Sequence, residues 1–205
     1  MYPSKFGLIV GFHGCDLKVR NGIVSGKMPF NLSYNDYDWL GNGMYFWENN
    51  RNRALQFATE LKGKVRIGKE VIKTPAVLGA IIDFGYCLDL LDEEFIRMVK
   101  DSYDIMARSI SDNGLRLPEN KPLKDSKDLL IRRLDCAVIE NLHEERKINN
   151  LRSSDTARGV FIEGRTLYPN AGFNEKNHIQ ICVRNPNCIK GFFIPREENI
   201  HFVVP

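Results

Sequence analysis

The sequence has no long run of apolar residues, no large excess of charge of one sign, and no basic-then-apolar leader at its start. A helix that spans a membrane needs about 18 consecutive apolar residues, so we expect neither a membrane span nor a secretory signal. The 29 basic and 26 acidic residues leave a net charge of +3, which permits a nucleic-acid partner but does not indicate one.

The five cysteines are odd in number and form no C-x-x-C pair. This pattern suggests neither a disulfide framework nor a zinc site, and it is typical of reduced thiols in a cytoplasmic protein. We therefore expect a cytoplasmic protein that binds no metal. With 205 residues, no internal repeat and no linker, the chain is expected to form one domain over residues 1–205.

Apolar runs rich in β formers lie towards both ends of the chain, and periodic apolar positions fill the middle. This distribution predicts an α+β fold whose sheet is assembled from both ends of the chain. The basic stretch 62–74 is expected to be an exposed loop. The predicted strands are 7–15, 76–84, 158–163, 178–184, 189–194 and 200–204, and the predicted helices are 51–61, 92–110 and 126–147.

The stretch at residues 36–58 reads DYDWLGNGMYFWENNRNRALQFA and organises the rest of the chain. Gly41 and Gly43 allow a tight turn because neither has a Cβ, and three aromatics from Tyr45 to Trp47 follow directly. Aromatics in this position are candidates for the wall of a pocket that binds a planar ligand. A glycine hairpin that leads into a core strand is the alternative interpretation.

A second stretch, GLIVGFHGC at residues 7–15, is an apolar run that ends in His13-Gly14. Together with the GNGMYF segment and the helix after it, this pair resembles the catalytic domain of ADP-ribosyltransferases of the PARP and diphtheria-toxin type. That family has a histidine-glycine pair on one strand, a Gly-x-Gly-x-Tyr-Phe segment on another and a helix behind them. The resemblance implies split, mostly antiparallel β-sheets flanked by helices, and NAD as the substrate.

The same resemblance implies roles for individual residues. His13 would bind the hydroxyl of the adenosine ribose, and the backbone of Gly14 would pair with the carboxamide of nicotinamide. Tyr45 would stack on the nicotinamide ring, behind the turn that Gly43 permits. All four residues are therefore candidates for binding NAD, and His13 and Tyr45 are also candidates for catalysis.

The family has a second stacking tyrosine, which aligns here with Gln56 in the predicted helix. Either Phe57 or Trp47 would have to take its place as a ring that contacts NAD. The sequence leaves this choice open.

The late stretch HIQICVRNPNCIKGFF resembles the last motif strand of the family and puts Gln180 where the catalytic glutamate usually stands. Glutamine keeps a carbonyl acceptor but lacks the charge that would stabilise the developing ribose cation, at a loss of about tenfold or more in rate. This argues against polymer elongation. Glu175 and Glu163 are nearby carboxylates that could supply the charge, and solvated loop residues are the alternative interpretation of both.

The sequence neighbours of the other three histidines indicate what each of them does. His178 lies two residues before Gln180, so both side chains should share one face of a strand, where His178 would recognise the acceptor or act as a general base. His143 lies among charged residues and is expected to be solvated, and His201 is expected to be structural.

We therefore expect a mono-ADP-ribosyltransferase, a type of glycosyltransferase, that uses NAD and modifies an acceptor the sequence does not name. That acceptor is a protein, a nucleic acid or a small molecule. The alternatives are a catalytically degenerate module that binds NAD or ADP-ribose, an RNA 2′-phosphotransferase of the same fold, and an interaction module with coincidental motifs. Arg158 and Arg184 lie near the motif strands but match no phosphate-binding pattern.

Overall fold

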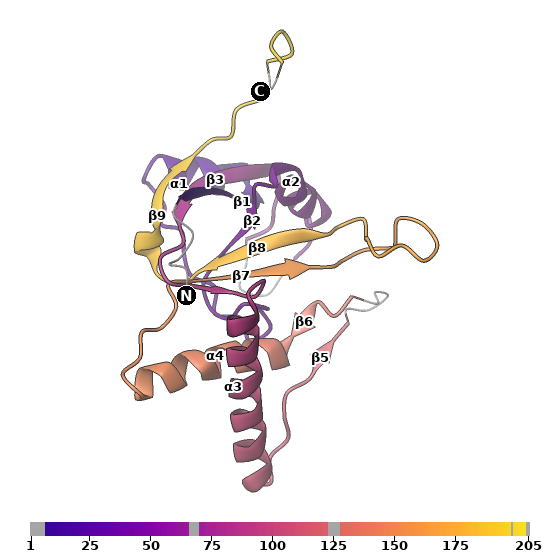
Figure 1. Cartoon of the computed structure of the whole chain (residues 1–205). Helices are drawn as coiled ribbons and strands as arrows, with labels where there is room; N and C mark the ends of the chain where they lie inside the picture. The colour runs from indigo at the N-terminus through magenta and orange to yellow at the C-terminus, as the bar shows by residue number, and fades with distance from the viewer. Residues whose placement is uncertain (1–6, 66–69, 123–127, 198, 204–205) are drawn as a thin grey trace.

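The computed structural model describes residues 7–65, 70–122, 128–197 and 199–203 (Figure 1). Its larger sheet has seven strands in the order β4-β7-β8-β2-β1-β3-β9, and the pairing of β4 with β7 is parallel whereas the other pairs are antiparallel. The strands are β1 (Leu8–Asp16), β2 (Met44–Glu48), β3 (Pro75–Asp83), β4 (Cys87–Asp89), β5 (Asn120–Lys121), β6 (Ile131–Arg132), β7 (Thr156–Phe161), β8 (His178–Val183) and β9 (Ile189–Phe193). The helices are α1 (Leu17–Val24), α2 (Arg51–Glu60), α3 (Glu93–Asp112) and α4 (Arg133–Ile148), with a 3-10 turn, η1, at Pro186–Cys188. The expectation of an α+β fold with a mostly antiparallel sheet is confirmed.

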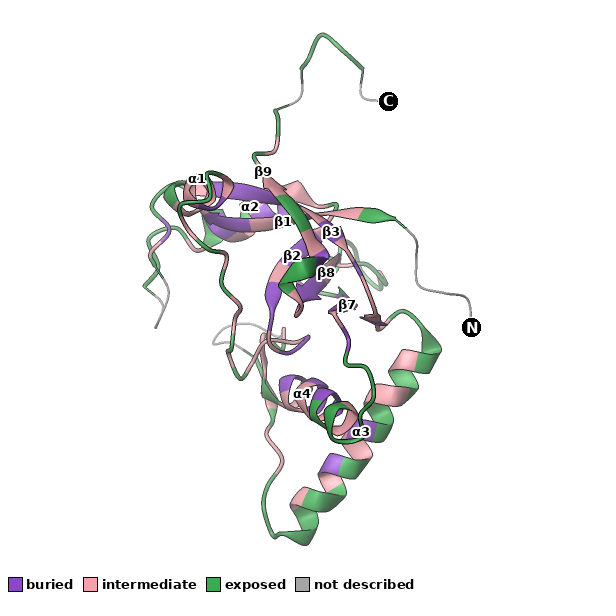
Figure 2. Cartoon of the chain, turned by 90° about the vertical axis from the view of Figure 1, so that its left-hand side faces the viewer, coloured by how far each residue is buried: buried purple, intermediate pink, exposed green. Residues whose placement is uncertain are grey.

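The helices cover different parts of the sheet. Helices α1 and α2 pack beside β1 and β3, whereas α3 and α4 pack against each other near the β4–β7 end (Figure 1). Figure 2 shows that burial is concentrated in the central strands and that the end of α3 farthest from the sheet is largely exposed. None of the helices in the described part of the chain is long and apolar enough to span a membrane.

Side chains of β2 alternate between two cores, as the pleat of a strand requires. Phe46 packs with Ile82 and Ile181 in one core. Tyr45 packs on the other face against Leu40 and Cys182. The central strands are therefore buried on both faces.

The pairing of β1 with β2 is short. It covers Gly11 with Glu48 and Phe12 with Trp47. Beyond these residues β1 continues along β3, and β2 continues along β8. The two central strands therefore separate and divide the sheet into two halves.

Most predicted elements are confirmed within a few residues, including the helices at 51–61 and 92–110, but the start of the last helix is wrong. Helix α4 begins at Arg133 rather than near residue 126, and residues 126–127 lie outside the described part. The side chain of Asn120 accepts hydrogen bonds from the amides of Leu134 and Asp135 at 3.0 and 3.2 Å. A residue from the β5–β6 pair thus satisfies the first turn, which no local capping signal reveals.

The strand predicted at 200–204 is also wrong. Residues 199–203 form a turn beyond β9, and residue 204 lies outside the described part. The segment runs away from the sheet (Figure 1), and Ile200 and Val203 are 90% and 96% exposed. Among the described residues no strand lies beside it to supply hydrogen bonds, so the β-forming residues at 200–203 do not form a strand. In the expected loop at 62–74, residues 66–69 lie outside the described part as well.

Candidate functional site

Strand β1 carries His13 to the point where β1 and β2 separate. The Nδ1 atom of His13 lies 2.8 Å from the carbonyl oxygen of Tyr45, so this nitrogen donates a hydrogen bond to β2. The imidazole ring lies edge-on to Phe30, with 4.9 Å between the ring centroids, and to Phe46 at 6.1 Å. His13 therefore bridges the two strands just beyond their last paired residues.

The backbone of Gly14 faces the same point. The amide of Asn49 donates to the carbonyl of Val10 at 2.9 Å, so the backbone polar groups of Val10 point towards β2. Because these groups alternate along a strand, those of Gly14 also point towards β2, beyond the last paired residue. A Cβ on Gly14 would lie 2.1 Å from the carbonyl oxygen of Ala54, so glycine allows α2 to lie directly against β1.

The phenol of Tyr45 is engaged inside the protein. Its hydroxyl donates to the carbonyl of Gly41 at 2.7 Å and accepts from the amide of Leu40 at 3.0 Å. Burial raises the pKa of Tyr45 well above its usual value. Because Phe12 pairs with Trp47, the side chains of His13 and Tyr45 lie on opposite faces of the sheet. The structure does not bring these two rings together, and the phenol holds the turn before β2.

Gly43 is a packing residue in this turn. A Cβ there would lie 2.3 Å from the Sγ of Cys182. Two residues outside the turn hold the backbone of the neighbouring Asn42. Glu140 accepts a hydrogen bond from its amide at 2.8 Å, and Arg184 donates one to its carbonyl at 3.1 Å. The turn is therefore rigidly attached to α4 and to the end of β8.

One face of the sheet gathers most of the other predicted residues. Trp47 of β2 and Gln180 of β8 are directly paired, and His178 precedes Gln180 on the same face. The ring of His178 stacks on Phe161 at 5.5 Å with an angle of 8° between the planes, and its centroid lies 6.1 Å from that of Trp47. Phe57 of α2 packs against Trp47 at 4.9 Å. Both aromatic candidates from the sequence thus belong to one cluster with Gln180.

His178 is hydrogen-bonded at both ring nitrogens. Its Nδ1 lies 2.6 Å from the carbonyl oxygen of Lys176, and its Nε2 lies 3.1 Å from the amide nitrogen of Gln180. Burial lowers the pKa of His178, although Glu163 nearby works in the opposite direction. The expectation that His178 and Gln180 share one face is confirmed.

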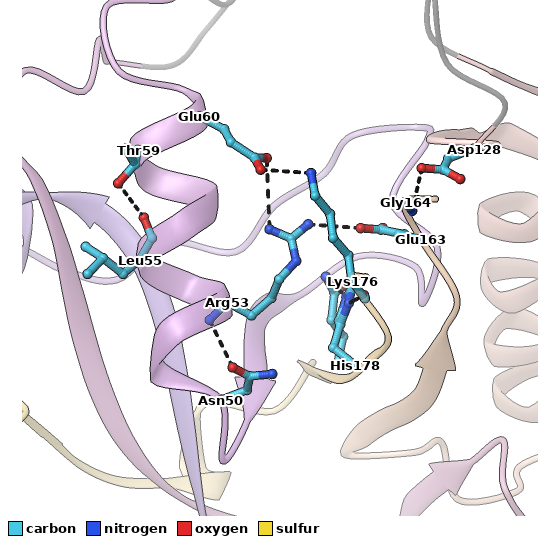
Figure 3. Close-up of polar contacts among 11 residues, drawn as sticks. Asn50, Arg53, Leu55, Thr59, Glu60, Asp128, Glu163, Gly164, Lys176 and His178 are labelled. Atoms are coloured by element: carbon cyan, nitrogen blue, oxygen red, sulfur yellow. Dashed lines mark hydrogen bonds and ion pairs between the residues drawn. The ribbon is translucent and has the colours of Figure 1, made fainter. Parts of the chain in front are cut away.

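Helix α2 adds a buried arginine that the sequence analysis missed. Arg53 donates from Nη2 to Glu163 at 2.9 Å, and Glu60 lies 4.0 Å from its Nη1 (Figure 3). Lys176 pairs with the same Glu60 at 2.8 Å (Figure 3). Arg53 lies four residues before Phe57 on the apolar stripe of the helix, which was the available sequence signal.

Three N–H groups of this cluster are unpaired. Among the described residues, Trp47 Nε1, Arg53 Nε and Arg53 Nη1 are buried and have no hydrogen-bond partner. Buried donors are nearly always paired in folded proteins, with protein or with ordered water. The cluster can therefore accept an oxygen-bearing group, which makes it the best candidate site in the described structure.

The two candidate carboxylates lie in different surroundings. Glu163 is buried and paired with Arg53. Glu175 is exposed and pairs at 3.1 Å with Arg165, whose side chain is 89% exposed. Of the two, only Glu163 belongs to the cluster, so the structure separates two residues that the sequence left equivalent.

His143 is not solvated as expected. It is buried in α4, and neither ring nitrogen has a hydrogen-bond partner within the described residues. Burial lowers the pKa of His143 to about 4. The described residues contain no group of three or more histidine, cysteine, aspartate or glutamate side chains arranged to hold a metal ion.

Comparison with known proteins identifies one distant relative. The chain is 27% identical over 202 residues to the "Uncharacterized protein MJ0359" of Methanocaldococcus jannaschii, a match that covers 87% of this chain and 83% of that protein. No protein-family model matches the chain. No solved structure matches it significantly.

Proposed function

We propose that this protein binds NAD and transfers ADP-ribose to an acceptor, as a mono-ADP-ribosyltransferase with a PARP-like fold. The observation that carries the proposal is the convergence of its motif segments. His13-Gly14, the segment from Tyr45 to Trp47, and Gln180 lie on three adjacent strands in the order β1, β2, β8. The first two segments come from the N-terminal part of the chain and Gln180 comes from the C-terminal part, and their adjacency in one sheet is what the resemblance implies.

The separation of β1 from β2 supports a binding mode for NAD. Backbone polar groups of Gly14 point to where the strands separate, and they can pair with a carboxamide. Tyr45 is occupied by Leu40 and Gly41, so the proposal assigns the ring contact to Trp47, which is paired with Gln180.

The reaction breaks the bond between nicotinamide and ribose, and the bonding electrons leave with nicotinamide. Positive charge then develops on the ribose carbon, as it does in glycoside hydrolysis, until the nucleophile of the acceptor bonds to that carbon and loses its proton. The carbonyl oxygen of Gln180 would accept a hydrogen bond from a ribose hydroxyl. Glu163 adds negative charge nearby, but its pairing with Arg53 offsets much of that charge, so we expect slow turnover.

A second candidate is a module that binds NAD or ADP-ribose without cleaving it. The observation that favours it is Gln180, because a neutral amide stands opposite Trp47 where the related enzymes have a carboxylate. Binding and cleavage must therefore be measured separately.

The test is incubation of the purified protein with labelled NAD, followed by measurement of NAD binding, nicotinamide release and transfer of label. We expect Gln180→Ala and Trp47→Leu to lower nicotinamide release by about tenfold or more, the loss expected for a contact made in the transition state. Glu175→Ala is the matched control, since this exposed carboxylate lies outside the cluster. Binding without release would support the module, and absence of both would overturn the proposal.

A further inference from the structure

The hydrogen bonds of His178 define which of its nitrogens carries the proton. A carbonyl oxygen can only accept, so the 2.6 Å contact with Lys176 places a proton on Nδ1. In a neutral ring Nε2 is then unprotonated and can only accept. The atom of Gln180 that lies 3.1 Å from it must be the amide nitrogen, acting as donor.

This arrangement fixes the direction of the Gln180 amide. The two orientations of a glutamine amide have nearly the same shape and differ in which side presents oxygen and which presents nitrogen. With its nitrogen held by His178, Gln180 presents its carbonyl oxygen on the side away from that ring. Oxygen is the atom that can accept from a ribose hydroxyl.

We propose that His178 is a positioning residue whose neutral ring holds the carbonyl oxygen of Gln180 towards the substrate, and that protonation of His178 reverses the amide and withdraws this oxygen. The inference rests on the proposed function, because it assigns the direction of a group that this function uses. It also replaces the general-base role expected for His178, since the lone pair that a base would need is occupied by Gln180.

Protonation reverses the amide because an imidazolium ring has two N–H donors and no acceptor. Nε2–H would then face the NH₂ group of Gln180, and rotation of the amide replaces this clash of donors with a charge-assisted hydrogen bond to oxygen. One proton is taken up from solvent, and no covalent bond other than the new N–H bond changes.

Groups from several elements face His178 and set the pH at which this occurs. Burial disfavours the charged ring most and Arg53 on α2 adds to this, whereas the carbonyl of Lys176 and the carboxylate of Glu163 favour the charged ring. Lys176 and Glu60 form an ion pair at the outer side of the cluster (Figure 3), and the rings of Phe161 and Trp47 are uncharged. We therefore expect the switch below the usual pKa range of histidine.

The first experiment reads the arrangement directly. In the full-length protein, ¹⁵N NMR of the imidazole rings reports the tautomer of His178, with His178→Phe identifying its signals among those of the four histidines. We expect the neutral form to carry its proton on Nδ1, and the side-chain amide signal of Gln180 to shift with the same midpoint as His178. A neutral form protonated on Nε2, or an amide signal that ignores the titration, would overturn the inference even if the protein cleaves NAD.

The second experiment follows NAD cleavage from about pH 4.5 to about pH 7.5, a range that brackets the titration of a histidine with a lowered pKa. We expect kcat/KM of the wild type to fall about tenfold as His178 is protonated, the loss of one hydrogen bond to the transition state. His178→Phe preserves a ring against Phe161 but leaves the amide free to rotate. It should start about two- to fivefold lower, show no acid limb and exceed the wild type at the acid end.

Gln180→Glu is the second variant. A carboxylate has no donor for Nε2, so it should keep His178 protonated, and it presents oxygen in either orientation, so kcat/KM should show no acid limb from His178. Circular dichroism at both ends of the pH range checks that each variant is folded. An acid limb that persists in both folded variants would contradict the inference. If the wild type does not cleave NAD, the proposed function fails, while the NMR result still decides whether His178 orients Gln180.

Discussion

Two buried arginines lie on opposite faces of the sheet and differ in how completely they are paired. Arg158 of β7 donates to both oxygens of Glu48 at 2.5 and 2.9 Å and to Asp89 at 3.2 Å. These carboxylates raise the pKa of Arg158, and the hydrogen bonds that Arg158 donates to Glu48 contribute most. Arg53 has one close carboxylate, Glu163, and two nitrogens without a hydrogen bond.

The difference teaches which charged group holds the fold and which is available for binding. A guanidinium whose three nitrogens all donate to carboxylates is engaged in holding the fold, and its removal takes a counter-charge from those carboxylates. A guanidinium with unused donors, next to an aromatic ring and a paired histidine and glutamine, still has donors for a ligand. The two buried histidines do not follow this contrast, since His178 has two hydrogen bonds and lies in the cluster, whereas His143 has none among the described residues and lies on α4.

The largest loss of stability is expected at Arg158, the arginine whose three nitrogens all donate to carboxylates. Arg158→Met should lower the free energy of unfolding by about 3–5 kcal/mol, because it removes a buried guanidinium that pairs with the half-buried carboxylates of Glu48 and Asp89. Urea denaturation monitored by circular dichroism measures this change. A loss below about 1 kcal/mol would show that this network does not hold β2, β4 and β7 together.

The next largest effect concerns the stability contributed by His143 and appears only at acid pH. The pKa of His143 is lowered by burial to about 4, so the unfolded chain binds a proton more readily than the folded one. Stability from this group is complete above about pH 6.5 and is lost as the pH falls towards about 4, by about 3 kcal/mol in total.

His143→Leu should remove this part of the acid sensitivity and leave stability near neutral pH almost unchanged, since no hydrogen bond is lost. Urea denaturation at about pH 7 and about pH 4.5 compares the variant with the wild type. Carboxylates such as Asp155 also contribute to acid unfolding, but they are common to both proteins. Equal losses of stability in the two proteins would contradict the prediction.

The sequence predicted most elements because their signals are local. The apolar run that ends at His13 and the stripe through Ala54 and Phe57 each show their period within a few residues. The start of α4 was misjudged because its first turn is satisfied by Asn120, a residue from another element. Local patterns do not contain this information.

The site could be predicted only in outline for the same reason. The motif residues His13, Tyr45 and Gln180 were found, but the sequence did not reveal that the first two side chains face opposite sides of the sheet. That property depends on the register of β1 against β2, and a shift of one residue would reverse it. His143 was misjudged because charged neighbours along a helix do not show which side of the helix is buried.

A smaller loss of stability is expected at Arg53, which has two buried nitrogens without a hydrogen bond. Arg53→Met should lower the free energy of unfolding by about 1–3 kcal/mol, because Glu163 loses its counter-charge but fewer hydrogen bonds are broken than at Arg158. The double variant Arg53→Met with Glu163→Gln should recover most of this stability, because no unpaired charge is then left in the cluster. If the double variant is no more stable than Arg53→Met, the unpaired carboxylate of Glu163 is not the cause of the loss.

The smallest effect tests whether the hydroxyl of Tyr45 stabilises the fold through its hydrogen bonds, as Arg158 does, or is available to a ligand, as Arg53 is. Tyr45→Phe removes the hydroxyl that bonds Leu40 and Gly41, and we expect a loss of about 1 kcal/mol in the free energy of unfolding. Hydrogen exchange should also become faster at the amide of Leu40, because that amide loses its acceptor. Urea denaturation and exchange measured by NMR check both effects. If neither changes, the phenol does not hold the turn, and its ring becomes available for the role in NAD binding that the sequence implied.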